Sequence, residues 1–360
     1  MERTLIPSYT IGADAYDGIS SVCAAYGTKA VMIGGKKALA AAQEKIISVL
    51  EGSPVEVVRC LWNGGEASVE NIERLTPDTE DADMIFAVGG GKAIDTAKVL
   101  AQRAGKPFFT FPTIASTCAA YTSLGILYHP DGSLREYSFS KVPANHVFIN
   151  TQIIAEAPVK YLWAGIGDTM AKHYECTVSS RGHTPRHSDG MGIALSTMCA
   201  KPLKVFGKQA LKDCEANTVT PDLTETVLGI IVSTGMVSNF VQVDYTTGLA
   251  HAVYNGFTIL PSTEAFHHLH GEVVAYGILV LLTVDKQYEE RDEVFRFSKS
   301  IGLPTKLADI HATEDDLQKV ADKALKGIDV RVYPYEVTAA TIINGIRELE
   351  EYNRGQEQSR

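Results

Sequence analysis

Three consecutive glycines form one stretch of this chain whose residue types could do chemistry. Gly89, Gly90 and Gly91 follow an apolar run, and Lys92 then begins an amphipathic segment. Glycine lets backbone N–H groups approach an anion closely, and a helix N-terminus adds partial positive charge, so the arrangement predicts a phosphate-binding turn. The spacing fits neither the dinucleotide fingerprint nor the lysine-serine phosphate loop. A simple tight turn would contain the same glycines.

A second glycine turn, Gly34-Gly35, follows the β-rich run Ala30–Ile33 and precedes Lys36 and Lys37. In dinucleotide sites a carboxylate at this place usually binds the adenosine ribose. Here two lysines beside glycine leave room and positive charge for a 2′-phosphate, which favours NADP(H) over NAD(H). The alternative is a helix N-terminus with solvated lysines.

Three hydroxyl side chains, Thr113, Ser116 and Thr117, lie near a chain reversal after another apolar run. Hydroxyls there could bind a pyrophosphate or the amide of a nicotinamide. A plain loop rich in serine and threonine is equally compatible with this composition.

One carboxylate and two imidazoles in the second half could hold a metal ion. Asp168, His251 and His270 form a ligand set that suits zinc or ferrous iron and leaves positions for water and substrate. Their separations along the chain are long, so spacing alone does not predict that they meet. Each histidine could instead be a core or surface residue, and Asp168 a helix N-terminal acid.

The predicted elements that must position these residues change near residue 150 from alternating strands and helices to helices alone. Before it, β-rich runs alternate with helical segments, which predicts a parallel sheet with helices on both faces. The runs are Ala30–Ile33, Val55–Leu61, Met84–Val88, Pro107–Phe111 and Val147–Asn150. Leu124–Tyr128 and Leu134–Ser138, joined through Pro-Asp-Gly, predict a β-hairpin. After residue 150 the segments are long and helical in period, which predicts an all-helical second half.

Length and charge narrow the class of protein. A chain of 360 residues can form two domains, and a formal net charge of −10 without any basic run argues against nucleic acid or an anionic membrane as partner. No apolar leader is present, and the run Val273–Val284 is too short to span a bilayer, so we expect a cytoplasmic protein. The six cysteines form no C-x-x-C pair, which indicates neither a disulfide framework nor a thiolate zinc site.

These stretches occur in a familiar order. The chain resembles the glycerol dehydrogenase-like branch of the iron-containing alcohol dehydrogenase family over nearly its whole length. The matching pieces are Gly65–Ser68, Gly89–Lys98, Pro112–Thr117, Ile153–Pro158, Gly165–Asp168, Ala250-His251, Asn255–Thr258 and His270–Glu272. The resemblance implies a Rossmann-like α/β dinucleotide domain over residues 1–155 and an all-α metal-binding and substrate domain over 156–360. The implied architecture is the two-domain arrangement also found in dehydroquinate synthase. The resemblance further implies that a nicotinamide and a divalent metal meet in the cleft between the domains.

Carried over position by position, the resemblance places the catalytic metal ligands at Asp168, His251 and His270. His267 and His268 compete for the last position, although the following Gly-Glu favours His270. With the residues argued above, the predicted cofactor-binding set is Gly35, Lys36, Gly89, Gly90, Gly91, Lys92, Asp95, Thr113, Ser116, Thr122, Leu124 and Tyr128.

Departures from the family pattern concern the substrate. Glycerol dehydrogenases carry an aspartate where this chain has Gly35, and Asp-Ala-Pro where it has Cys118-Ala-Ala-Tyr121. Loss of that second carboxylate removes a hydrogen bond to a polyol, on the order of 1.5–3 kcal/mol. The Cys-Ala-Ala-aromatic stretch looks more like the hydroxycarboxylate dehydrogenase members, which reduce 2-oxo acids with NADPH. Tyr254 replaces a histidine that the family often carries, so we predict Cys118 and Tyr254 as substrate contacts.

The function predicted from the sequence is therefore a metal-dependent, NAD(P)-linked oxidoreductase. The preferred reaction interconverts a 2-hydroxy acid and a 2-oxo acid with NADP(H), and the alternative is oxidation of glycerol or another polyol with NAD. A remote alternative is a dehydroquinate synthase-type lyase, which needs a basic cluster that the helical half does not offer. We expect a small-molecule substrate, and a homo-oligomer would agree with the resemblance.

Overall fold

The computed structural model describes residues 4–130, 132–139 and 142–358. Contacts divide the chain into two compact units. The sheet unit comprises Met1–Leu162 and Gln209–Asn239, and the helical unit comprises Trp163–Lys208 and Phe240–Arg360. The boundary predicted between residues 155 and 156 stays a prediction, and the contacts add that residues 209–239 pack with the sheet.

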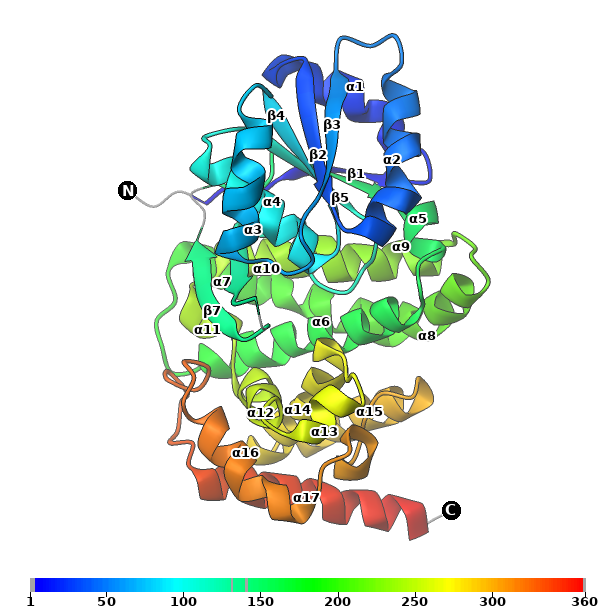
Figure 1. Ribbon diagram of the computed structural model, residues 1–360. Helices are drawn as coiled ribbons and strands as arrows, with labels where there is room; N and C mark the ends of the chain where they lie inside the picture. Colours follow the sequence, from blue (N-terminus) through cyan, green and yellow to red (C-terminus); the bar gives the residue numbers. More distant parts are fainter. Residues whose placement is uncertain (1–3, 131, 140–141, 359–360) are drawn as a thin grey trace. The chain divides into compact units, whose positions relative to one another are not determined.

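The sheet unit contains a six-stranded parallel sheet in the order β1-β8-β5-β4-β2-β3 (Figure 1). Its strands are β1 (Ser8–Gly12), β2 (Lys29–Gly34), β3 (Glu56–Trp62), β4 (Met84–Gly89), β5 (Phe108–Pro112) and β8 (His146–Asn150). The remaining strands, β6 (Leu124–Tyr128) and β7 (Leu134–Phe139), form the predicted antiparallel hairpin. Of the strands in the described residues, sequence reasoning missed the edge strand β1, because its residues, Ser-Tyr-Thr-Ile-Gly, include a single aliphatic side chain and show no apolar run.

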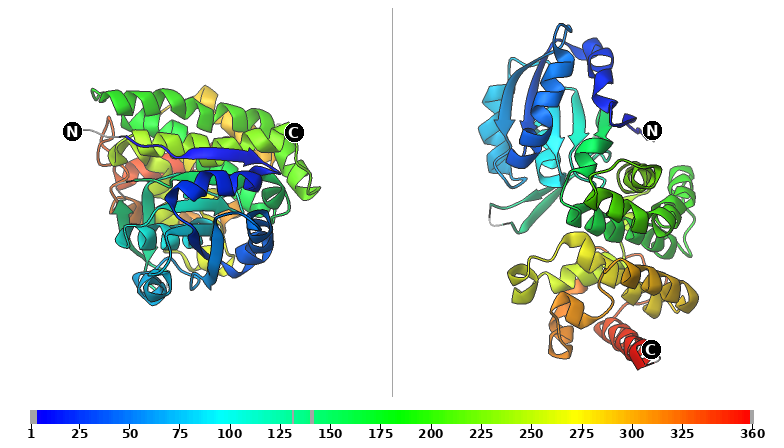
Figure 2. Two further views of the ribbon diagram at one scale, coloured as in Figure 1. Left: turned by 90° about the horizontal axis from the view of Figure 1, so that it is seen from above. Right: turned by 90° about the vertical axis from the view of Figure 1, so that its right-hand side faces the viewer.

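Helices cover both faces of the sheet, as Figure 2 shows from the side. They are α1 (Ile19–Cys23), α2 (Lys36–Leu50), α3 (Val69–Leu75), α4 (Gly91–Arg103) and α5 (Thr151–Ala155). Met32, Phe86 and Phe109 share one buried cluster with Ile19 and Ile46 of α1 and α2. Every residue of β4 is buried, as expected for a central strand covered on both faces. The predicted Rossmann-like α/β fold is thus confirmed.

The described residues after 160 form helices joined by turns and loops, without a strand among them, which confirms the predicted helical C-terminal part. The helices are α6 (Lys160–Ser179), α7 (His187–Leu195), α8 (Lys201–Glu215), α9 (Pro221–Leu228), α10 (Thr234–Phe240), α11 (Val243–Thr246), α12 (Leu249–Phe257), α13 (Pro261–Ala265), α14 (His270–Val284), α15 (Tyr288–Ser300), α16 (Leu317–Ala324) and α17 (Ala339–Gln358). Helix α14 is buried from Val273 to Thr283, and it packs against α12, α15 and α17. A helix that is apolar on every side requires such a surrounding shell.

Within the described residues, one helical run is long and apolar enough, by length and composition alone, to cross a bilayer. It extends over Pro221–Phe240, where α9 and α10 are joined by the π-helical turn Gly229–Ser233. However, 56% of the tested window is buried inside the protein, which is also the pattern of a core helix.

The edge strand β1 is held by a buried histidine of its neighbour β8. His146 is only 5% exposed, and its Nδ1 and Nε2 atoms lie 2.7 Å from Ser8 Oγ and 2.8 Å from Thr10 Oγ1. Burial lowers the pKa of His146. The neutral imidazole can accept one of these hydrogen bonds and donate the other, whereas the charged form can only donate.

We therefore expect β1 to loosen in acid. Below about pH 6.5 the unfolded chain binds a proton that folded His146 resists, so the free energy of unfolding falls as pH drops from there toward the lower folded pKa. Amide exchange of residues 8–12, corrected for its intrinsic pH dependence, should be faster at pH 5 than at pH 7.5. In His146→Gln this extra pH dependence should disappear. Equal protection of wild-type β1 at both pH values would contradict the expectation.

Candidate metal and dinucleotide sites

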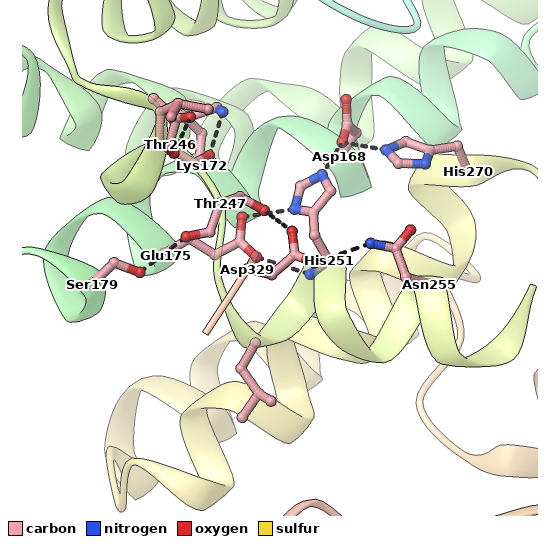
Figure 3. Close-up of polar contacts among 12 residues, drawn as sticks. Asp168, Lys172, Glu175, Ser179, Thr246, Thr247, His251, Asn255, His270 and Asp329 are labelled. Atoms are coloured by element: carbon pink, nitrogen blue, oxygen red, sulfur yellow. Dashed lines mark hydrogen bonds and ion pairs between the residues drawn. The ribbon is translucent and has the colours of Figure 1, made fainter. Parts of the chain in front are cut away.

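Three helices of the helical unit each carry one of the predicted metal ligands, and the structure brings these ligands together (Figure 3). Asp168 lies on α6, His251 on α12 and His270 at the start of α14. Asp168 Oδ1 is 3.1 Å from His270 Nε2 and 3.4 Å from His251 Nε2. One ligand atom from each residue lies within 4.8 Å of the others. This is the only such group found among the described residues.

Close backbone contacts at glycines set the spacing of these helices. A Cβ on Gly271 would lie 1.9 Å from the carbonyl oxygen of Ala164, and one on Gly167 would lie 2.3 Å from that of Gly271. A Cβ on Gly277 would lie 2.4 Å from the carbonyl oxygen of Ala250. Helix α14 thus touches both α6 and α12 at residues that only glycine can occupy. The first contact is directly beside two of the ligands.

The charges of the site favour a cation. Burial alone would raise the pKa of the Asp168 carboxyl, but His270 and His251 hold it well below its ordinary range. Burial would lower the pKa of His251, but Glu175 and Asp168 raise it to about 10. A proton on His251 therefore partly balances the buried carboxylates when no metal is bound. A divalent cation can replace that proton, and one carboxylate with two imidazoles is a donor set that fits zinc or iron(II).

Glu175 is a contact of the predicted ligand His251 that sequence reasoning missed. Its side chain is fully buried on α6, with Oε2 2.7 Å from His251 Nδ1 and Oε1 accepting the His251 backbone N–H at 2.8 Å. A carboxylate on Nδ1 fixes the ring so that Nε2 stays directed toward Asp168. The available signal was its position seven residues after Asp168, which places both acids on one face of the helix.

A second layer of hydrogen bonds fixes the chain just before α12 (Figure 3). Asp329 accepts from Thr247 Oγ1 at 2.5 Å and from Asn255 Nδ2 at 3.2 Å. Lys172 Nζ donates to the carbonyl oxygen of Thr246 at 2.6 Å. The start of the helix that carries His251 is therefore held from two sides.

The competing histidines, His267 and His268, do not join the ligand group. His268 lies 2.8 Å from Glu272 Oε1 through Nδ1 and 2.8 Å from His311 Nδ1 through Nε2. His267 is exposed and has a positive φ of 53°. Of the three histidines in this stretch, His270 alone meets Asp168 in the ligand group.

Tyr254, predicted as a substrate contact, lies beside the predicted metal ligand His270. Its ring centroid is 4.3 Å from that of His270, at an interplanar angle of 79°. The tyrosine thus packs edge to face with the imidazole and limits the orientations open to His270.

The predicted phosphate turn lines a pocket of the sheet unit. Gly89 ends β4 with a φ of +141°, Gly90 caps α4 and Gly91 begins it. The pocket is lined by Gly89, Gly90, Gly91, Ile94, Pro112, Ile114, Ser116, Thr117, Ala119 and Ala120. Backbone N–H groups at a helix start, hydroxyls and a concave surface suit an anionic ligand such as a pyrophosphate.

The second glycine turn adjoins the first. The Gly35 backbone nitrogen lies 3.8 Å from the place a Cβ would occupy on Gly89. Strands β2 and β4, which lead into the two turns, are neighbours, and the order of the sheet reverses between them. Dinucleotides bind at such switch points. Next to Gly35, the Lys36 Nζ lies 4.2 Å above the ring of Trp62.

Two predicted cofactor residues are already paired within the protein. Lys92 Nζ is 2.6 Å from Glu66 Oε2, although the lysine side chain is 64% exposed. Asp95 is buried, binds Lys98 and accepts the N–H of Ile126. A direct contact of either residue with the cofactor stays a prediction.

The other predicted contacts lie around the loop that follows β5. Thr113 donates its N–H to the Gly89 carbonyl at 3.2 Å, and the Thr122 hydroxyl donates to the Leu124 carbonyl at 3.2 Å. Tyr128 donates its N–H to Ala67. Cys118 is half-buried in the same loop but does not line the pocket. Its contact with substrate also stays a prediction.

Comparisons with known proteins indicate the family of the chain. Residues 7–150 match the family model described as iron-containing alcohol dehydrogenase. Similar sequences include a glycerol dehydrogenase from Thermotoga maritima, 35% identical over 301 residues and 81% of both chains. Hydroxycarboxylate dehydrogenase A from Escherichia coli is 34% identical over 333 residues and 90% of both chains. Among solved structures, glycerol dehydrogenase from Schizosaccharomyces pombe has a TM-score of 0.89 at 27% identity, over 100% of this chain and 93% of that one.

We expect Gly271→Ala to disrupt the metal centre and the fold. The new methyl group would press on the Ala164 carbonyl and force α14 away from α6, at a loss of about 2–4 kcal/mol in stability. Gly190→Ala is the matched control, because a Cβ there meets nothing within 4 Å. Zinc content and the thermal midpoint should both fall for Gly271→Ala and stay near wild type for Gly190→Ala. Full zinc content in Gly271→Ala would contradict this account.

We expect Glu175→Gln to weaken metal binding by about 10- to 100-fold, because the ring of His251 loses the negative charge on Nδ1. The measurement is competition for zinc with a chelator at pH 7. Glu290→Gln is a suitable control, since Glu290 pairs with Tyr174 and Lys204 outside the ligand cluster. Equal zinc affinity of the Glu175 variant and wild type would refute the role assigned to this residue.

Proposed function

Because this chain belongs to the iron-containing alcohol dehydrogenase family, we propose that it is a metal-dependent dehydrogenase that oxidises a small polyol with a nicotinamide cofactor. The observation that carries the proposal is the meeting of Asp168, His251 and His270 on three helices. The similar sequences named above are dehydrogenases rather than lyases, which favours this reaction class over the dehydroquinate synthase-type alternative.

Asp168, His251 and His270 would hold the metal. When bound, a divalent cation polarises a substrate oxygen and stabilises the alkoxide, and a nicotinamide exchanges the hydride. The side chains of this protein prepare that chemistry. Glu175 keeps His251 oriented, and Tyr254 restricts the ring of His270. No nucleophilic side chain is required, so Cys118 is proposed as part of the substrate pocket rather than as a reactant.

The glycine turns would hold the dinucleotide. Gly90 and Gly91 line the pocket at the start of α4, where backbone N–H groups and the helix dipole favour a pyrophosphate. Ser116 and Thr117 add hydroxyls on the same pocket. These contacts do not depend on whether the cofactor carries a 2′-phosphate.

A polyol is the first substrate candidate because similar proteins from several organisms are named glycerol dehydrogenase. This places the alternative of the sequence analysis ahead of its preferred 2-hydroxy acid. A 2-hydroxy acid is the second substrate candidate, and one observation favours it. Cys118 occupies the place of a carboxylate in the glycerol enzymes, so a repulsion against an anionic substrate is absent there. Hydroxycarboxylate dehydrogenase A is also similar over 90% of the chain.

NADP(H) is the cofactor we propose, on the evidence of Gly35 and Lys36. A Cβ on Gly35 would meet only the Ala38 methyl, at 4.0 Å, so packing does not demand a glycine at this position. Lys36 lies over Trp62 beside it and can supply positive charge for a 2′-phosphate. Position 35 carries no carboxylate, which would repel that phosphate, although the packing leaves room for a Cβ there.

A cytoplasmic location is also part of the proposal. All six cysteines are described and none forms a disulfide, which agrees with a reducing compartment. The proposed partner is a small-molecule substrate. A homo-oligomer remains an expectation from the family resemblance.

The first test is a side-by-side assay of zinc- or iron-loaded protein with glycerol and 2-hydroxybutyrate, and with dihydroxyacetone and 2-oxobutyrate in reverse. We expect turnover of the polyol pair, with Asp168→Ala inactive and free of metal but still able to bind the dinucleotide. Turnover of the acid pair alone would move the second candidate to first place. Activity in metal-free Asp168→Ala would reject the metal-dependent mechanism.

The cofactor proposal predicts the effect of Gly35→Asp. The new carboxylate should repel the 2′-phosphate and bind the ribose of NADH, so kcat/KM for NADPH relative to NADH should fall by about tenfold or more. Gly35→Asn has nearly the same shape without the charge and should change the ratio much less. If the two variants behave alike, charge at this position does not select the cofactor.

A further inference from the structure

Helix α4 contains a buried ion pair that the proposed mechanism does not use. The side chain of Lys98 is fully buried and that of Asp95 is 9% exposed, with Lys98 Nζ 2.9 Å from Asp95 Oδ1. Burying two charges is unfavourable unless their remaining hydrogen-bonding capacity is also satisfied. The partners that satisfy it therefore indicate what the pair does.

Those partners belong to one short segment, the strand β6. Lys98 Nζ donates to the Leu124 carbonyl at 2.6 Å, and Asp95 Oδ2 accepts the Ile126 N–H at 3.2 Å. The residue between them has no side chain. A Cβ on Gly125 would lie 3.1 Å from Val99 Cγ2 and 3.8 Å from Lys98 Cδ. The backbone of β6 therefore lies directly on α4, with one charged group bonded on each side of Gly125.

The hairpin depends on such anchors. It is a two-stranded sheet separate from the main sheet, and Leu134 to Tyr137 of β7 are exposed. A two-stranded hairpin alone is at best marginally stable in water. Another backbone anchor is the Tyr128 N–H, which donates to the Ala67 carbonyl at 2.8 Å. By contrast, the Arg135–Glu70 pair at 3.3 Å is exposed and should contribute little.

The face of α4 that carries the ion pair begins at the phosphate turn. Gly91, Asp95 and Lys98 are spaced four and three residues apart, so they lie along one stripe of the helix. Gly91 lines the dinucleotide pocket. Of the predicted cofactor contacts, Leu124 and Tyr128 belong to β6. One helix face therefore connects the phosphate turn to the strand that carries these contacts.

We propose that Asp95 and Lys98 are positioning residues that clamp β6 to α4, so that the hairpin and the phosphate turn bind the nicotinamide dinucleotide as one rigid unit. This inference rests on the proposed function. It assigns Asp95 an indirect role in cofactor binding, exerted through the backbone of Leu124 and Ile126, in place of direct contact.

The test uses the double variant Asp95→Leu with Lys98→Met in the full chain. Removing both charges together avoids leaving one buried and unpaired, while the hydrogen bonds to Leu124 and Ile126 are lost. Arg135→Gln is the matched control, because it removes the exposed ion pair of the same hairpin. The readouts are amide exchange of residues 124–128 without cofactor, the Kd of NADPH and NADH by fluorescence, and the thermal midpoint.

We expect exchange in residues 124–128 to be faster by about tenfold or more and both Kd values to rise by about tenfold, at a thermal midpoint close to wild type. Arg135→Gln should match wild type in every readout. Wild-type exchange in the double variant would overturn the clamp. A raised Kd without faster exchange would show that Asp95 touches the cofactor directly, and faster exchange with an unchanged Kd would show that the clamp does not serve binding.

A second variant keeps the proposal testable if the double variant does not fold. Gly125→Val leaves both charges in place but presses the strand against Val99, so it should also raise exchange and weaken binding. If it binds both dinucleotides as wild type does, the proposal is wrong. Failure of the wild-type protein to bind either dinucleotide would instead reject the proposed function, while the exchange result would still decide whether the clamp exists.

Discussion

The interaction on which the helical unit depends is the contact of one imidazole with two carboxylates, one fully buried and one 14% exposed. His251 lies between Asp168 and Glu175, which belong to the same helix, and together they raise its pKa to about 10. Two buried negative charges need a positive partner, because an unpaired ion in a protein interior is strongly unfavourable. A proton on His251 can serve as that partner, and so can a divalent cation. The charges of the cluster are thus of the sign that the proposed metal ion would balance.

Geometry and electrostatics support each other at this point. Carboxylate and imidazole atoms can come within 4.8 Å only if their helices approach closely, and Gly167 and Gly271 permit that approach directly beside the ligands. The apolar helix α14 is buried along most of its length, so its position is determined by packing against several neighbours. A ligand at its first residue is therefore held by a core, in agreement with the general need to support a functional site on rigid elements.

In the sheet unit, rigid packing supports the proposed dinucleotide site in a similar way. Its glycines form a turn at the end of the fully buried strand β4. The ion pair of Asp95 and Lys98 connects the following helix, α4, to the hairpin of β6 and β7. Both charged networks join segments that are distant in sequence. In each case the buried charge satisfies the backbone or the ring of a residue that is proposed to bind ligand, so stability and function rest on the same hydrogen bonds.

The sequence alone predicted the sheet, the hairpin and the helical half, because alternation and helical period are local properties that the chain shows within each segment. It also indicated Asp168, His251 and His270, through residue types and family resemblance. Spacing alone could not reveal that these residues meet, and the sequence did not indicate that Glu175 contacts His251 or that Asp95 is enclosed by β6. Those features depend on which helix faces pack together, and contacts such as Gly271 on Ala164 decide that at long range. Local periodicity identifies the face of a helix that is buried, whereas only the tertiary structure determines what that face meets.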